Sequence, residues 1–269
     1  MSKIEVTLRT PKDNGRKGFI PFVTAGDPDL ETSLEIVRTL AKSGADIIEL
    51  GVPFSDPMAD GPTIQRSSQR ALENGTNLRS VVALVERFRE TFDTPIVLFS
   101  YLNPLMQYGV ERLAATCEQI GIDGILVTDA IDDEANEIAA ILKGKNIDLI
   151  SLIAPTTTDE RLKRISGSAA GFLYAVSRAG VTGARSEMSN AAEILVGRAR
   201  QFTDLPIAVG FGISTRDQVL DVWKYADAAV VGSAIVAEIE RSNASNAVRN
   251  VERLLHSLLP QFAKASDEI

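Results

Sequence analysis

The sequence predicts a (β/α)8 barrel, or TIM barrel, with extra helices, and three observations lead to this fold class. Eight short apolar runs recur along the 269 residues, which is the strand number of that barrel. Stretches with the 3.6-residue period of amphipathic helices separate the runs. No low-complexity linker breaks the alternation. Residues 1–269 are therefore expected to form one barrel domain, and a doubly wound open sheet is the alternative if fewer of the runs are strands.

The eight expected strands are runs of four to six residues that are apolar almost throughout. Strands of this kind are typical of a parallel sheet covered on both faces, because neither face meets water. The strands are expected at Phe19–Val23, Asp46–Leu50, Ile96–Tyr101, Gly124–Val127, Asp148–Ile153, Gly171–Val176, Pro206–Val209 and Asp227–Val231.

Helical patterns follow each of these strands. The first covers residues 30–45, where Asp29 or Thr32 is expected to cap the start and Gly44 suits the end. One extra helix is expected near Pro62–Glu73 and one more after Asn243. The remaining helices are expected at Leu78–Phe92, Val110–Ile120, Asp133–Leu142, Thr158–Ile165, Asn190–Phe202, Thr215–Trp223 and Ser233–Glu240.

The composition is that of an ordinary globular protein and narrows the classes of partner. Hydrophobic residues make up 45% and charged residues 24%, which excludes a disordered chain. The net charge of −8 argues against nucleic acid or an anionic membrane as partner, and no stretch approaches the roughly 18 apolar residues of a membrane span. A single Cys117 and a single His256 disfavour disulfides and metal sites. Without a secretory signal, we expect a cytoplasmic protein with no metal.

One carboxylate, Glu49, lies inside the second expected strand. A buried carboxylate is costly unless it is paired or used, and its pKa is usually raised. Because Glu49 lies near the carboxyl end of its strand, where barrel chemistry is found, we favour an acid–base role over a buried ion pair. The loop that follows holds Asp56 and Asp60 among prolines and glycines. For Asp60, a turn or capping role in Asp-Gly-Pro stays equally open.

Three glycine-bearing stretches follow the last three strands, at Ser177–Gly183, Gly210–Ser214 and Gly232–Ala234. Glycine lets backbone N–H groups approach an anion, and barrels commonly bind phosphate after strands seven and eight. No expected strand contains Lys, which disfavours a Schiff-base aldolase, and the single histidine disfavours a zinc aldolase. The residues therefore indicate carboxylate acid–base chemistry on a phosphorylated substrate.

Several of these stretches belong to a longer pattern that resembles one family. The pattern comprises PFVTAGD at Pro21–Asp27, ELGVPFSDPMADGPTIQ at Glu49–Gln65, APTTTDERL at Ala154–Leu162, SRAGVTG at Ser177–Gly183, GFGIS at Gly210–Ser214 and GSA at Gly232–Ala234. From about Gly18 to Ala237 the chain resembles the tryptophan synthase α subunit family. The resemblance implies a (β/α)8 fold and cleavage of indole-3-glycerol phosphate into indole and glyceraldehyde 3-phosphate, the α reaction of tryptophan biosynthesis, with no cofactor in this chain.

The resemblance also implies roles for individual residues. Glu49 and Asp60 match the catalytic positions of the family. The matched substrate-binding positions are Gly183, Gly212, Gly232 and Ser233 for the phosphate, and Phe22, Tyr174, Thr182 and Phe211 for the indole and glyceryl parts. Ser177–Ser189 is expected to be a lid over the substrate.

The implied partner is a β subunit that carries pyridoxal phosphate, in an α2β2 tetramer. The loop Pro53–Asp60 and an Asn103–Leu105 turn are expected on the docking face. Thr128–Ile131 and Ala226–Ala228 depart from the family pattern, but neither includes a matched catalytic position. Two alternatives remain, a stand-alone lyase of the same fold and a silent regulatory subunit.

Overall fold

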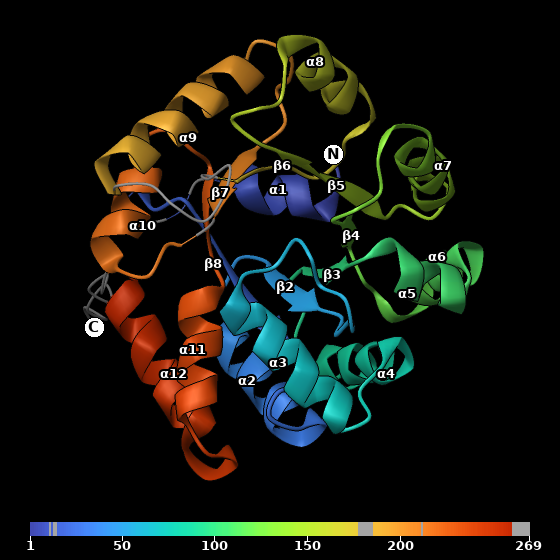
Figure 1. The fold of residues 1–269 in the computed structure, drawn as a ribbon, viewed down its shortest axis with the longest axis vertical. Coiled ribbons are helices and arrows are strands. Elements are labelled where there is room, and N and C mark those ends of the chain that lie inside the picture. The colour runs from blue at the N-terminus through green and yellow to red at the C-terminus, as the bar shows by residue number, and fades with distance from the viewer. Residues whose placement is uncertain (11, 13–14, 177–184, 211, 260–269) are drawn as a thin grey trace, which may run out of the picture.

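The computed structural model describes residues 1–10, 12, 15–176, 185–210 and 212–259. Eight parallel strands form a closed barrel in the order β1 to β8, and β8 pairs with β1 (Figure 1). This closure confirms the predicted fold class and excludes the open sheet. The strands are β1 Gly18–Thr24, β2 Ile48–Gly51, β3 Ile96–Ser100, β4 Gly124–Val127, β5 Asp148–Ile153, β6 Leu173–Val176, β7 Ile207–Gly210 and β8 Ala228–Val231.

Twelve helices are assigned within the described residues, and most of them surround the barrel (Figure 1). They are α1 Lys3–Arg9, α2 Leu30–Lys42, α3 Pro62–Glu73, α4 Leu78–Arg89, α5 Leu102–Tyr108, α6 Val110–Ile120, α7 Asp132–Lys143, α8 Asp159–Ser168, α9 Arg185–Ala199, α10 Arg216–Val222, α11 Ser233–Arg241 and α12 Ala244–Leu258. In this part of the chain, no helix is both long and apolar enough to cross a membrane.

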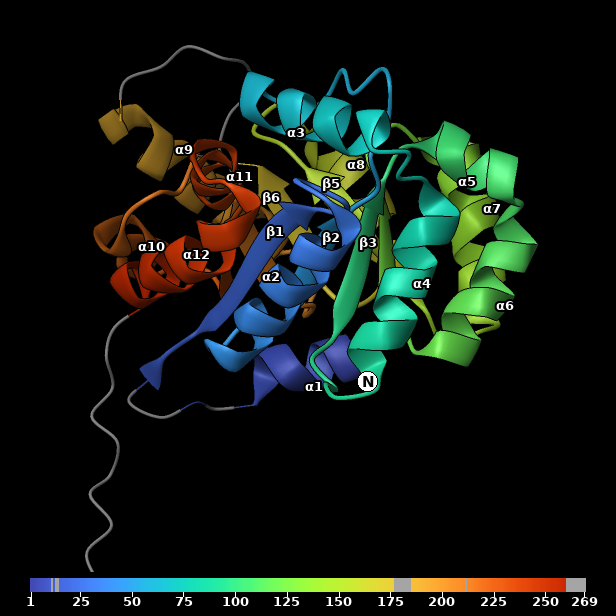
Figure 2. The same cartoon turned by 90° about the horizontal axis from the view of Figure 1, so that it is seen from below.

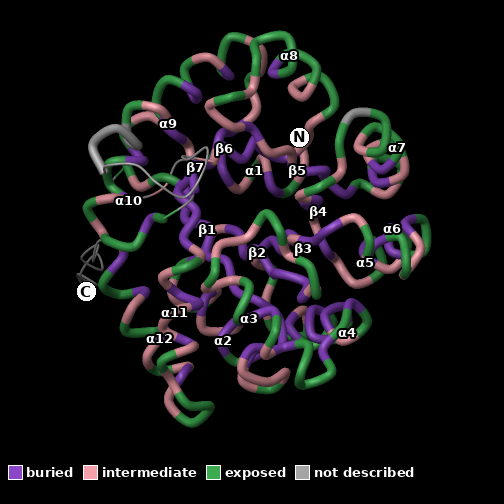
Figure 3. The backbone as a smooth tube through the Cα atoms, viewed as in Figure 1, coloured by how far each residue is buried: buried purple, intermediate pink, exposed green. Residues whose placement is uncertain are grey.

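The strands divide the core into two clusters because their side chains alternate between the two faces. One cluster lies between the sheet and the outer helices. The other fills the barrel interior and includes Ile20, Val97, Leu126 and Tyr174. Buried residues follow the strands and the inward faces of the helices, as Figure 3 shows. The near-continuous apolar runs of the sequence reflect this burial on both faces.

The two ends of the barrel are covered differently (Figure 2). Helix α1 closes the amino-terminal end, where Ile4 and Leu8 are buried in the interior cluster. A side chain at Gly124 would come within 2.9 Å of Ile4, and one at Gly18 within 2.7 Å of Leu8, so these glycines let the helix approach the strands. Helix α3 lies at the opposite end of the barrel (Figure 2). Because α1 covers the amino-terminal end, a site between the strand termini is expected at the carboxyl-terminal end, where α3 lies.

An aspartate just before β2, β4 and β8 fixes the amino-terminal edge of the sheet. Asp46, Asp123 and Asp227 each accept a backbone N–H at the start of the preceding strand, from Phe19, Ile96 and Ile207, at 2.7, 2.9 and 2.8 Å respectively. Each also pairs with an arginine, for example Asp123 with Arg89 at 2.8 Å. The carboxylates thereby satisfy strand N–H groups that have no partner in the sheet.

Most of the predicted elements are confirmed to within a few residues, including the extra helix α3 and the terminal helix α12. Asp29 caps α2 by accepting the Thr32 N–H at 2.8 Å, as predicted. The prediction of a turn at Asn103–Leu105 was wrong, because these residues lie in helix α5. Pro104 is the third residue of α5, and a proline in the first turn of a helix removes no intrahelical hydrogen bond.

Candidate active site

Glu49 is the buried carboxylate of the barrel interior. It lies on β2 beside Phe22 of β1 and Val97 of β3, and only 1% of its surface is exposed. Both of its carboxylate oxygens are buried without a hydrogen-bond partner in the described part of the chain. Burial raises the pKa of Glu49 to about 8, because a low-dielectric environment disfavours the charged form. The predicted burial is confirmed, and the side chain is mostly protonated at neutral pH.

Asp60 lies in the loop between β2 and α3, and two side chains fix its position. The Tyr101 hydroxyl donates to its carboxylate at 3.0 Å and accepts the Ala59 N–H, also at 3.0 Å. Gln65 of α3 donates to its backbone carbonyl at 2.9 Å. Burial raises the pKa of Asp60 to about 6, and the hydrogen bond from Tyr101 acts in the opposite direction. Asp60 is therefore mostly ionised at pH 7, whereas Glu49 is mostly neutral.

Tyr174 lies close enough to Glu49 and Asp60 for both carboxylates to affect its pKa. It lies on β6, and its pKa is raised above its ordinary value by burial and then by the charges of Glu49 and Asp60. All three groups therefore face one region near the carboxyl ends of the strands. Gly210 on the neighbouring strand makes room for the ring, because a side chain there would come within 2.8 Å of the Tyr174 Cζ atom.

Phe22 forms an apolar wall beside Glu49. Its ring meets Phe99 edge-on, with centroids 5.2 Å apart and an interplanar angle of 76°. A side chain at Gly51 would lie 2.7 Å from Phe22 Cζ, and one at Gly232 would lie 3.3 Å from the same side chain. Because Gly51 and Gly232 have no side chains, the Phe22 ring has room to pack between them. An aromatic wall next to a neutral carboxyl suits a flat apolar ring that receives a proton.

The start of α11 offers backbone donors to an anion. Gly232 is the N-cap residue and Ser233 the first helical residue, and no side chain caps this end. By contrast, Thr215 and Gln218 form a capping box at the start of α10. Gly212 has a φ of +80°, a conformation that favours glycine. Unpaired N–H groups at a helix start bind phosphate well. Among the described residues, no group of three potential metal ligands comes together.

Comparison with known proteins agrees with this geometry. The sequence model of the family described as tryptophan synthase alpha chain matches residues 8–266. The chain belongs to the tryptophan synthase alpha chain family. A tryptophan synthase alpha chain from Desulfosudis oleivorans is 48% identical over 242 residues, which cover 90% of this chain and 91% of the relative. One from Marinobacter nauticus is 45% identical over 271 residues and covers 100% and 99%. The crystal structure of tryptophan synthase subunit alpha from Legionella pneumophila superposes with a TM-score of 0.87 at 36% identity and covers 96% and 97%.

Three of the residues matched to the tryptophan synthase alpha chain pattern, Thr182, Gly183 and Phe211, lie outside the described residues. Most of the expected lid, Ser177–Ser189, lies there too. The structure brings the other matched residues to one end of the barrel, with Glu49, Phe22 and Tyr174 on strands, Asp60 and Gly212 in loops, and Gly232 and Ser233 at a helix start.

The residues that hold the site in place were not predicted from the sequence. Tyr101 follows directly after β3, at the strand end where a site residue is expected, and that position was its only signal. Gln65 has the same kind of role on α3. Asp129 accepts the Leu102 N–H at 2.7 Å and so anchors the start of α5, although the residues around it depart from the family pattern.

Proposed function

We propose that this chain cleaves indole-3-glycerol phosphate into indole and glyceraldehyde 3-phosphate, with Glu49 as the acid–base catalyst. The observation that carries the proposal is the carboxyl of Glu49, which is buried beside an aromatic wall and has no partner in the described part of the chain. Its burial and unsatisfied oxygens are costly to stability, and a group retained at such a cost suits proton transfer to a bound substrate.

Glu49 would carry out both proton transfers of a retro-aldol cleavage. As the neutral acid it gives its proton to indole C3, and as the resulting carboxylate it takes the proton of the glyceryl hydroxyl. The bond between C3 and the glyceryl carbon then breaks, its electron pair restores the aromatic indole, and the hydroxyl carbon becomes the aldehyde. Glu49 ends the cycle protonated, as it began. A carboxyl with a pKa of about 8 suits both transfers near neutral pH.

Asp60 would stabilise the positive charge that develops on the indole ring after C3 is protonated. With a pKa of about 6, it is mostly ionised when Glu49 is mostly neutral, and it can accept the indole N–H. Two carboxyls in different environments can divide the acid and the electrostatic roles in this way. Phe22 and Tyr174 would contact the indole and glyceryl parts.

The phosphate of the substrate would bind at the start of α11, on the backbone of Gly232 and Ser233, with Gly212 beside it, and Gly183 is assigned to the phosphate by the family pattern alone. A helix start without a side-chain cap supports this assignment, because its N–H groups and the partial positive charge of the helix attract an anion. Thr182 and Phe211 are assigned to the same substrate by the family pattern alone.

The partner would be a tryptophan synthase β subunit carrying pyridoxal phosphate, in a cytoplasmic α2β2 tetramer, while this chain needs no cofactor of its own. The support lies in three exposed apolar side chains in the segments that follow β2, β3 and β4. Met58 is 91% exposed, Met106 62% and Ile131 54%. Exposed apolar groups clustered at one end of a protein commonly mark an interface, and this is the end at which indole would leave.

The purified chain tests the proposal directly. Incubated with indole-3-glycerol phosphate, it should release indole and glyceraldehyde 3-phosphate in equal amounts, and addition of a β subunit should raise the rate and produce a larger complex in light scattering. No indole with or without the β subunit would favour the silent regulatory subunit. Full activity with no complex would favour the stand-alone lyase.

A further inference from the structure

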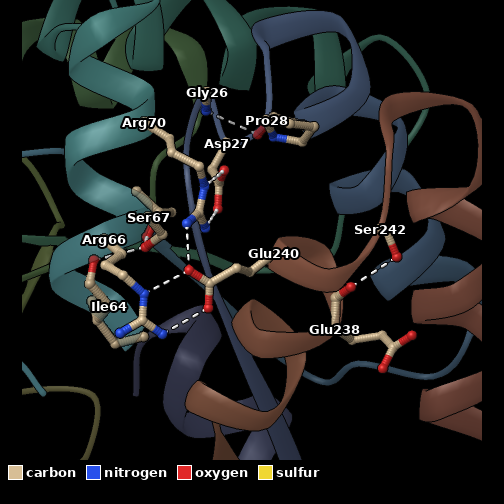
Figure 4. A network of polar contacts seen from close by, with 12 residues as sticks. Gly26, Asp27, Pro28, Ile64, Arg66, Ser67, Arg70, Glu238, Glu240 and Ser242 are labelled. Carbon is tan, nitrogen blue, oxygen red and sulfur yellow. Dashed lines mark hydrogen bonds and ion pairs between the residues drawn. The ribbon is translucent and has the colours of Figure 1, made fainter. Parts of the chain in front are cut away.

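Four charged side chains form a continuous network beside the carboxyl ends of the strands. Arg70 donates two hydrogen bonds of 2.8 Å to the two carboxylate oxygens of Asp27, and a third of 2.8 Å to Glu240. Arg66 donates to both oxygens of the same Glu240, at 2.6 and 2.7 Å. Within this network, the carboxylate of Glu240 accepts from both guanidinium groups, while that of Asp27 accepts from Arg70 (Figure 4).

The two arginines belong to the helix that carries the Asp60 loop. Helix α3 begins two residues after Asp60, and Gln65 from the first turn of the helix donates to the carbonyls of Asp60 and Pro57, at 2.9 and 3.3 Å. The position of α3 therefore sets the position of the Asp60 loop. Arg66 and Arg70 lie one helical turn apart, so both can hold Glu240 from the same face.

The carboxylates belong to two other segments that lead to the site. Asp27 follows β1, and Thr24 at the end of β1 makes a second contact with α3 through its hydroxyl, 2.6 Å from that of Ser67. Glu240 lies near the end of α11, the helix that begins at Ser233 after the N-cap residue Gly232, which makes no side-chain cap. The network thus joins the helix that carries the Asp60 loop to the helix that starts at the candidate phosphate site.

The energetics of the network favour a role in geometry over a role in stability. Asp27 is only 1% exposed, and burial raises its pKa despite the hydrogen bonds from Arg70. A buried ion pair whose desolvation is not fully repaid adds little stability. Arginine nevertheless fixes direction, because its planar fork binds carboxylates in one orientation. Hydrogen bonds from Arg66 and Arg70 lower the pKa of Glu240 to about 2, so the contact persists at neutral pH.

We propose that Asp27, Arg70 and Glu240 form a positioning brace that sets the spacing between the Asp60 loop and the phosphate-binding start of α11. This inference rests on the proposed function, in which one substrate spans both places with its indole and phosphate ends. None of the three residues touches the reacting atoms. The brace acts on the distance between the two ends of the site, so it affects a linked ligand more than either half of that ligand.

The experiment compares linked and separate ligands in Glu240→Gln. The linked probe is 3-(indol-3-yl)propyl phosphate, which has both ends of the substrate but lacks the hydroxyl that starts cleavage. The separate probes are propyl phosphate and indole. Glu240→Gln should weaken binding of the linked probe and lower kcat/KM for indole-3-glycerol phosphate by about 10- to 100-fold, since a misplacement near 1 Å can cost that much. Binding of propyl phosphate and of indole should stay unchanged.

Glu31→Gln is the matched control. Arg87 of α4 binds both oxygens of Glu31 on α2, at 2.6 and 2.8 Å, so this bridge has the same form but joins helices outside the brace. Both glutamine variants should lower the thermal midpoint by no more than about 4 °C, while only Glu240→Gln changes the linked probe. Arg70→Lys is a second test, because one ammonium nitrogen cannot reproduce the fork that binds Asp27 and Glu240 together.

The brace is refuted if Glu240→Gln and Arg70→Lys bind the linked probe as the Glu31→Gln control does, or if the separate probes weaken as much as the linked one. These binding results do not depend on catalysis. A wild-type chain that binds the linked probe but releases no indole from indole-3-glycerol phosphate would contradict the proposed function, and the comparison of probes would still decide the brace.

Discussion

Replacing Glu49 with glutamine should stabilise the protein, and the gain should grow as pH rises. The folded chain buries the carboxyl without a partner and raises its pKa from 4.5 to about 8. The unfolded chain releases the proton near pH 4.5, but the folded chain keeps it until about pH 8. A group whose pKa is raised by folding contributes stability at low pH and loses that contribution as pH rises through the folded pKa.

The size of the effect follows from the shift. Each pKa unit corresponds to 1.36 kcal/mol, so the wild-type carboxyl lowers the free energy of unfolding by about 3 kcal/mol at pH 7, relative to low pH, and by about 5 kcal/mol above pH 8. Glutamine has a similar size and does not ionise. The difference in unfolding free energy between Glu49→Gln and wild type should therefore increase by roughly 1.4 kcal/mol per pH unit between about pH 5 and pH 8.

Urea unfolding of both proteins from pH 4.5 to pH 8.5 measures this difference. Glu31→Gln is a control, because hydrogen bonds from Arg87 lower the pKa of the exposed Glu31 from its ordinary value of 4.5. The contribution of that carboxylate to stability is lost only as pH falls below about 4.5, so the difference between Glu31→Gln and wild type should stay flat from pH 4.5 to pH 8.5. A Glu49→Gln difference that stays flat across pH, or a variant less stable than wild type at pH 8, would refute the burial argument and indicate that Glu49 has a charged partner.

Three further substitutions test separate parts of the account. Tyr101→Phe removes the hydrogen bond that lowers the pKa of Asp60, so the acid limb of the kcat–pH profile should move to higher pH and kcat should fall roughly tenfold at pH 7; an unmoved limb would contradict this. Gly232→Asp places a carboxylate at the start of α11 and should raise KM strongly, and an unchanged KM in the folded variant would exclude the phosphate site. Asp123→Ala removes the carboxylate that pairs with Arg89 and accepts the first N–H of β3 and should cost about 2–4 kcal/mol in urea unfolding with kcat of the folded protein intact; a lost kcat would show that the two ends of the barrel are coupled.

The barrel could be predicted because its signals are local. Each strand is a short apolar run, and the helices show a periodic apolar pattern with capping residues. Glu49 stands out as a carboxylate near the carboxyl end of an apolar strand. Helix α1 was missed because it is only seven residues long and contains Val6 and Thr7, whose β-branched side chains are poor helix formers. The four-residue spacing of Ile4 and Leu8 was the available signal, and packing against the barrel decides the outcome.

The contacts that hold the site could not be predicted because they join residues far apart in the sequence. Tyr101 meets Asp60 from 41 positions away, and Arg70 meets Glu240 from 170 positions away. No local pattern distinguishes these side chains from exposed tyrosines and arginines. The same limit applies to Gly51 and Gly232, whose role follows from the nearby ring of Phe22.

In the proposed reaction, the buried carboxyl of Glu49 transfers the protons that release indole. The most direct test is a single-turnover measurement of indole formation from indole-3-glycerol phosphate at pH 7, with wild type and Glu49→Gln both saturated with substrate and both shown to be folded. We expect Glu49→Gln to bind the substrate but to form indole about 10²–10⁴-fold more slowly. A variant that forms indole at the wild-type rate would contradict this expectation.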